Sequence, residues 1–267
     1  MIASLAMYDQ PWLQATNDRL WSAIGSHLRS QGVADFPPRL TRGVDLDDVW
    51  RSPRLLLGQT CGYPLMSELR ETVQLVATPH YRAEGCSGAQ HRSAIIVRAD
   101  DPATTLPDLR GRRLGVNSFR SNSGMNLLRA AVAPYAEAQP FFGRVVLTGS
   151  HARSYAGVLS GKIDVAAIDA VTLAHLRSRY PRRAGAARVL AWTAPSPGLP
   201  LVTAASTSPE TIAALRSALA SVAKDPALCD TLGPLLISGF EVLSLEDYEP
   251  VLSLEQASIA QRYLELA

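Results

Sequence analysis

Three small polar residues, Ser121, Asn122 and Ser123, stand before a glycine and an apolar stretch that we expect to be helical. The first N–H groups of a helix have no partner within it and carry a partial positive charge. Small hydroxyl residues next to glycine also let a phosphate group approach the backbone. Because serine and asparagine are equally the preferred caps of an ordinary helix, the segment predicts either a plain cap or half of an anion site.

A second helix start has the same character. Ser150 and His151 follow the strand expected at 144–148, and an imidazole N–H can donate to an oxyanion. Helix starts that follow strands of one parallel sheet open on the same edge, where α/β proteins bind ligands. This coincidence favours a small-anion site. Asp169, at the end of the strand expected over 162–168, is a further candidate, either as a ligand or as the cap of the next helix.

A third turn follows the buried strand expected at 55–60. Thr60, Gly62 and Tyr63 lie in it, and the glycine permits a close approach of the backbone. An ordinary strand-to-helix turn explains the same residues equally well.

Two tyrosines and one basic pair lie at the ends of other strands. Tyr8 ends the first strand and Tyr81 follows the strand 73–78, so both are either ligand-lining or simply edge aromatics. His91 and Arg92 precede a strand, and we assign them to the surface or to a hinge.

Motifs for catalysis and cofactors are missing from the sequence. It contains no Gly-x-Ser-x-Gly elbow, P-loop or Gly-x-Gly-x-x-Gly. The histidines lack metal-ligand spacing, so we expect no catalytic residue, no metal and no cofactor. The cysteines are Cys61, Cys86 and Cys229; a Cys61–Cys86 bridge is conceivable, but reduced thiols are favoured.

Composition describes an ordinary globular protein. Of 267 residues, 47% are hydrophobic and 19% charged, with a net charge of +2. This balance argues against nucleic acid, and no apolar run reaches the roughly 20 residues that span a bilayer. The N-terminus has no basic residue before Arg19, and Asp9 interrupts its apolar stretch. We therefore expect a cytoplasmic protein, or a periplasmic one if the chain starts at the mature N-terminus.

Apolar runs alternate with helical patterns along the whole chain, which indicates an α/β fold. We expect helices over 12–31 and 209–223, among others. The compact strand–helix series after residue 114 predicts a second lobe over 101–194, with 1–100 and 195–267 forming the first. Each lobe should contain a mostly parallel sheet flanked by helices, joined by a hinge with two crossings.

Four stretches carry a family likeness. They are Asp108 to Ser118 (DLRGRRLGVNS), Ser121 to Gly124 (SNSG), Thr148 to Ser154 (TGSHARS) and Gly161 to Asp169 (GKIDVAAID). In this order and spacing the chain resembles the phosphate, phosphite and phosphonate ABC-transporter substrate-binding proteins, over roughly residues 55–205. The resemblance implies the two-lobed type II periplasmic-binding-protein fold.

The resemblance also implies roles for individual residues. Ser121, Asn122 and Ser123 would present hydroxyl and N–H groups to a tetrahedral oxyanion, and His151 would donate to it. The first lobe would contribute the turn 60–63. An acidic ligand that the family uses for an amine falls on Val171 in this sequence, while the carboxylate of Asp169 lies nearby.

The expected function is capture of a small oxyanion, such as phosphate, phosphite or a phosphonate, in an interlobe cleft by hinge closure. The candidate partner is an ABC transporter permease, with no nucleic acid and no membrane insertion; the oligomeric state stays open. The alternatives are a cytoplasmic enzyme of the same fold, resembling chorismate dehydratases or thiamine-pyrimidine synthases, and a ligand sensor.

Overall fold

The computed structural model describes residues 1–137 and 140–266, and the chain divides into two compact units. Unit 1 consists of Met1–Arg82, Ser87–Ala89 and Gly198–Asp247. Unit 2 consists of Ala83–Cys86, Gln90–Pro197 and residues 248–266. The chain passes between the units near residues 82–90, 197–198 and 247–248.

These bounds differ from the predicted lobes in two segments. Residues 90–100 and the C-terminal residues from 248 onward were expected in the first lobe, but they cluster with unit 2. The strand β6 (Ser93–Arg98) pairs with β9 (Val165–Asp169), and helix α10 (Glu249–Ala260) packs against α4 (Leu127–Ala136). Long-range pairing of this kind leaves no local signal in a single sequence.

Unit 1 contains one five-stranded sheet. Its strands are, in sheet order, β1 (Ile2–Ser4), β2 (Leu55–Gln59), β12 (Leu201–Ala204), β3 (Val73–Tyr81) and β13 (Ile237–Glu241). The pair β1–β2 is parallel, whereas β12 pairs antiparallel with both β2 and β3, and β13 pairs antiparallel with β3.

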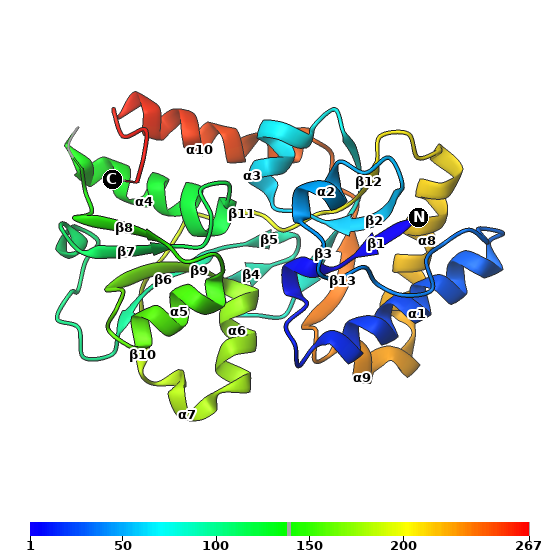
Figure 1. Cartoon of the computed structure of the whole chain (residues 1–267), viewed down its shortest axis with the longest axis horizontal. Coiled ribbons are helices and arrows are strands. Elements are labelled where there is room, and N and C mark those ends of the chain that lie inside the picture. Colours follow the sequence, from blue (N-terminus) through cyan, green and yellow to red (C-terminus); the bar gives the residue numbers. More distant parts are fainter. Residues whose placement is uncertain (138–139, 267) are drawn as a thin grey trace. The chain divides into compact units, whose positions relative to one another are not determined.

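Two amphipathic helices cover the core of unit 1. Helix α1 (Gln14–Ser30) buries Leu20, Ile24 and Leu28 at the spacing of one helical face. It packs against α8 (Pro209–Lys224), and Figure 1 shows the two beside each other. Both helices lie within about two residues of the predicted ends. The shorter helices are α2 (Leu46–Trp50), α3 (Gly62–Pro64) and α9 (Cys229–Leu232).

Unit 2 contains a second five-stranded sheet. Its strands are, in sheet order, β10 (Ala187–Trp192), β6, β9, β7 (Arg113–Val116) and β8 (Arg144–Leu147). Both β8 and β9 run parallel to β7, whereas β6 is antiparallel to β9 and β10 to β6. The remaining elements are β4 (Cys86–Ser87), β5 (Gln90–His91), β11 (Ser196–Pro197), α5 (His151–Leu159), α6 (Ala170–Arg179) and α7 (Pro181–Ala184). Figure 1 shows α4 and α10 lying together.

The α/β class is confirmed, but the expectation of mostly parallel sheets was wrong. Parallel pairing is confined to β1–β2 and to the series β7, β8, β9, whose strands are joined through helices α4 and α5. Alternation of strands and helices in the sequence indicates crossover connections, but it does not fix the direction of a strand that joins the sheet from another segment.

Two further expectations are testable in the described residues. Cys61, Cys86 and Cys229 are free thiols, as the sequence favoured. Within residues 1–137 and 140–266, no helix has the length and apolar character to cross a membrane.

Candidate functional site

Three strands of unit 2 deliver polar residues to one edge of its sheet. Because β8 and β9 are parallel to β7, the segments that follow the three strands emerge at the same edge. After β7 come Asn117 and residues 121–124; after β8 comes the start of α5; after β9 comes the start of α6. The predicted convergence of the Ser121, His151 and Asp169 segments is therefore present within this unit.

Ser121 caps the helical segment that follows β7. Its Oγ accepts a 2.9 Å hydrogen bond from the N–H of Gly124, and the chain continues through a π-helical turn, Asn122–Asn126, into α4. The amide of Asn122 is fully buried: its Nδ2 donates to Ser196 Oγ at 2.8 Å and its Oδ1 accepts from Asn126 at 3.1 Å. The Asn122 side chain therefore anchors the turn.

Ser123 and His151 bring the two helix starts into contact. Oγ of Ser123 lies 2.9 Å from Nε2 of His151, and Ser150 caps α5 by accepting a 3.2 Å bond from the N–H of Arg153. Burial lowers the pKa of His151 below its ordinary 6.5, although the charge of Asp169 opposes this shift. The imidazole is therefore neutral at pH 7, and its Nδ1 is buried with no hydrogen-bond partner among the described residues.

Gly124 is the residue that lets these groups approach. A Cβ at this position would lie 1.8 Å from Oδ1 of Asn117 and 3.0 Å from Cε1 of His151. Any side chain here would therefore displace the asparagine or the imidazole. Asn117 Oδ1 is itself buried without a described partner. The sequence indicated the glycine through its place beside Ser123, but it gave no indication that Asn117 packs against it.

Asp169 is held by a histidine that sequence reasoning placed elsewhere. Its Oδ2 lies 3.0 Å from Nδ1 of His91, and its Oδ1 accepts a 2.8 Å bond from the N–H of Thr172 at the start of α6. His91 is 2% exposed, so its assignment to the surface or hinge was wrong. The reason is that β6 pairs with β9, which brings residues 78 positions apart together.

The charge on Asp169 is strongly stabilised inside unit 2. Burial alone would raise the pKa of this carboxyl, but the hydrogen bond and charge of His91, the charge of His151 and the bond from Thr172 together lower it from 3.8 to about 2. Both carboxylate oxygens are thus engaged by protein groups. Asp169 acts as a cap and charge partner in this structure, which was one of its two predicted roles.

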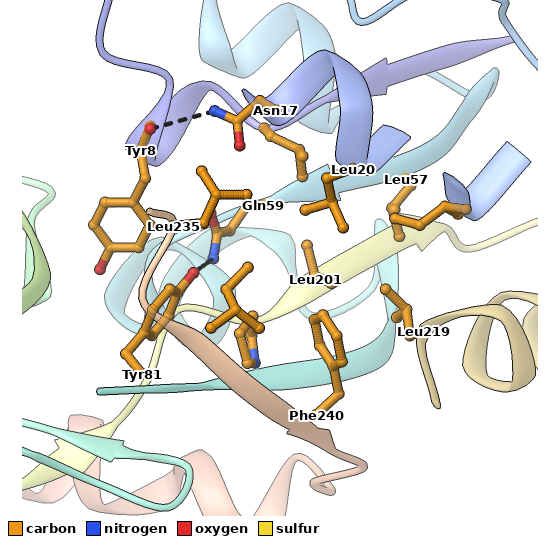
Figure 2. A pocket seen from close by; sticks show the side chains of 14 residues that line it. Tyr8, Asn17, Leu20, Leu57, Gln59, Tyr81, Leu201, Leu219, Leu235 and Phe240 are labelled. Atoms are coloured by element: carbon orange, nitrogen blue, oxygen red, sulfur yellow. Dashed lines mark hydrogen bonds between the residues drawn. The ribbon is translucent and has the colours of Figure 1, made fainter. Parts of the chain in front are cut away.

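In unit 1, Tyr8 and Tyr81 come together as predicted edge aromatics. Their rings meet edge to face with centroids 5.3 Å apart. Nε2 of Gln59 donates to the Tyr81 hydroxyl at 3.1 Å and to the carbonyl of Leu199 at 3.2 Å. Figure 2 shows the two tyrosines at one end of a pocket whose other end is formed by leucines. Tyr8 lies in a short 3-10 helix, Ala6–Tyr8, rather than in the first strand.

The predicted turn after β2 is separate from this pocket. Thr60 is fully buried, and its N–H donates to the carbonyl of Pro200 at 3.0 Å. Gly62 begins α3, and Tyr63 is half-buried. In the described part of unit 1, Thr60, Gly62 and Tyr63 are absent from the pocket lining, whereas Gln59 and Asn17, which were not predicted, belong to it.

A family model matches residues 55–248, nearly three quarters of the chain. That family is described as the phosphonate ABC-transporter periplasmic substrate-binding protein. The chain belongs to this family. A comparison with curated proteins found no match.

Solved structures share the fold of the chain at low sequence identity. A binding-protein component of an ABC phosphonate transporter, PA3383 from Pseudomonas aeruginosa, is 17% identical with a TM-score of 0.75, covering 97% of this chain and 86% of that one. PhnD1 from Prochlorococcus marinus, solved with methylphosphonate, is 14% identical with a TM-score of 0.71 and coverages of 91% and 93%. XAC2383 from Xanthomonas citri, solved with ATP, is 20% identical with a TM-score of 0.70 and coverages of 94% and 97%.

These findings settle the class of the protein. It has the type II periplasmic-binding-protein fold and belongs to a family of transporter solute-binding proteins. The predicted function as a binding protein is confirmed, and the alternative of a lyase-type enzyme finds no support in the family.

Proposed function

We propose that this protein binds a phosphonate-type oxyanion on the edge of unit 2 where Ser123 meets His151. The observation that carries the proposal is the 2.9 Å contact between Ser123 Oγ and His151 Nε2, at the junction of two helix starts. A hydroxyl and an imidazole at this distance from each other can both turn a donor toward one oxyanion. The N-terminus of α5, nine residues long, adds its partial positive charge.

The relatives favour a phosphorus oxyanion over other anions. Methylphosphonate in PhnD1 and ATP in XAC2383 share a tetrahedral phosphorus centre with charged oxygens. The donor set of this chain suits that shape, since a neutral imidazole, a serine hydroxyl and backbone N–H groups approach from different directions. Ser121 and Ser150 serve as caps that hold the two helix starts in place.

The remaining parts of the proposal follow from the family. Ligand contacts from both units would select a closed state, with the predicted contribution of Thr60, Gly62, Tyr63, Tyr8 and Tyr81 from unit 1. The protein would act in the periplasm and deliver its ligand to an ABC transporter permease. A ligand-dependent fall in the radius of gyration, measured by small-angle scattering, would support closure, and an unchanged radius would refute it.

The site itself is tested by one substitution and its matched control. Ser123→Ala removes the hydroxyl beside His151, and Ser160→Ala removes an exposed serine at the far end of α5. A hydrogen bond to a charged group contributes about 1.5–3 kcal/mol, so calorimetric titration of methylphosphonate should show affinity falling roughly ten- to a hundredfold in Ser123→Ala. The control should keep the wild-type affinity. Equal affinities in the two variants would remove this helix start from the site.

A further inference from the structure

Unit 1 contains a cavity that lies inside its hydrophobic core. It is enclosed between the sheet and helices α1 and α8 by leucines from several elements, among them Leu20, Leu57, Leu201, Leu219 and Leu235, each at most 5% exposed. Figure 2 shows these side chains opposite the Tyr8–Tyr81 pair. The cavity therefore has an aliphatic interior and an aromatic end.

The polar groups around the cavity are already occupied. Gln59 donates to the Tyr81 hydroxyl and to a carbonyl. Asn17 donates to the carbonyl of Tyr8 at 3.4 Å and to Asp9 Oδ1 at 2.8 Å. No charged side chain is among the described residues that line the cavity. A charged group placed here would lose its hydration without a partner, whereas a hydrocarbon group would gain from leaving water.

The size of the cavity limits what it can hold. A water-sized group can place its centre in about 30 Å³ of it, and one such group needs about 10–15 Å³. The space therefore suits two or three methylene-sized groups. A longer chain would have to displace core leucines that are packed to nearly zero exposure.

A second observation, in unit 2, also disfavours a cationic ligand group. Asp169 is the carboxylate at the edge where the oxyanion is proposed to bind, and both its oxygens are engaged by His91 and Thr172. Its charge is thus committed within the protein, and it is 1% exposed. An ammonium group on the ligand would have to break this buried pair to reach it.

We infer that the cavity of unit 1 receives the hydrocarbon substituent of the ligand, which makes the preferred ligands short alkylphosphonates of two to three carbons. The inference rests on the proposed function, because it assumes that the phosphonate group itself is held on unit 2. It adds the chemical class of the substituent, an uncharged alkyl chain, and a set of residues that recognise it.

The first test uses the wild-type protein and four ligands. Calorimetric titrations with methyl-, ethyl- and propylphosphonate should show affinity rising about fourfold per methylene, since each buried CH₂ is worth about 0.8 kcal/mol. 2-Aminoethylphosphonate has the same number of heavy atoms as propylphosphonate but ends in a charged amine. It should bind at least tenfold more weakly than propylphosphonate. Equal affinities along the alkyl series, or a preference for the amine, would overturn the inference.

The second test fills the cavity. Leu235→Phe adds a ring to a lining position, and Leu232→Phe makes the same change at a buried position of the same core that does not line the cavity. We expect Leu235→Phe to bind propylphosphonate no better than methylphosphonate, and Leu232→Phe to keep the wild-type ratio. Retention of that ratio in Leu235→Phe would contradict the inference. If Leu235→Phe fails to fold, the comparison of the propyl and aminoethyl ligands on the wild-type protein decides the matter.

The two proposals fail in different ways. If methylphosphonate and its homologues all leave the protein unaffected, the oxyanion site of the proposed function is refuted, and the inference falls with it. If they bind but chain length has no effect, the oxyanion site stands and the alkyl cavity alone is refuted.

Discussion

Replacing Asp169 with asparagine removes a buried charge while keeping the size of the side chain. The drop in the pKa of Asp169 from 3.8 to about 2 corresponds to about 2.5 kcal/mol of stability, at 1.36 kcal/mol per pH unit. Because the folded pKa is the lower one, this contribution is complete above about pH 5 and is lost as the pH falls toward 2. Asp169→Asn should therefore lower the melting temperature at pH 7 by roughly 5–10 °C.

The assay is thermal unfolding followed by circular dichroism, at pH values from 7 down to 2. Asp164→Asn is the matched control, because Asp164 precedes the same strand, β9, and pairs with Arg113, whose side chain is 45% exposed. A surface pair of this kind contributes at most about 1 kcal/mol. The gap between wild type and Asp169→Asn should close as the pH approaches 2. A variant as stable as wild type at pH 7, or a gap that persists at pH 2, would refute the reasoning about the His91–Asp169 pair.

Three further substitutions test the oxyanion site. Gly124→Ala should cost about 1–3 kcal/mol of stability by chemical denaturation, because its Cβ would overlap Asn117; Gly185→Ala, which meets nothing within 4 Å, is the control, and equal stability of the two would contradict the packing argument. Ser123→Asp should abolish phosphonate binding by placing like charge beside the anion while the circular dichroism spectrum stays unchanged; wild-type affinity would exclude this residue from the site. Burial keeps His151 neutral at pH 7, and a bound anion favours its protonated form, so affinity should rise from pH 8 to pH 6 more steeply in wild type than in His151→Gln. Parallel pH profiles in titration calorimetry would show that the imidazole does not respond to the ligand.

The sequence predicted the parts of the fold that local pattern determines. Helices α1 and α8 were placed within about two residues of their ends, because one apolar face at helical spacing is a strong local signal. The helix starts at Ser121 and Ser150 were likewise visible, because cap residues stand next to the helices they cap. The class of ligand followed from the combination of these starts with the family likeness.

Features that depend on distant pairing could not be predicted. Ser93 lies opposite Asp169 across the β6–β9 pair, and this register buries His91 and assigns residues 90–100 to unit 2. The cavity of unit 1 is equally invisible in the sequence, because Leu20, Leu57 and Leu219 come from three elements far apart along the chain. Only the folded packing shows that these leucines leave a space beside Tyr8 and Tyr81.

The most direct test of the central claim is a thermal-shift measurement of the purified protein with methylphosphonate, phosphate, phosphite and sulfate. A ligand present at about 100 times its dissociation constant adds about 2.7 kcal/mol, which for a chain of this size raises the midpoint by several degrees. The account predicts such a shift with methylphosphonate, a smaller one or none with sulfate, and loss of the methylphosphonate shift in Ser123→Asp. An equal shift with sulfate, or no shift with any phosphorus oxyanion, would contradict it.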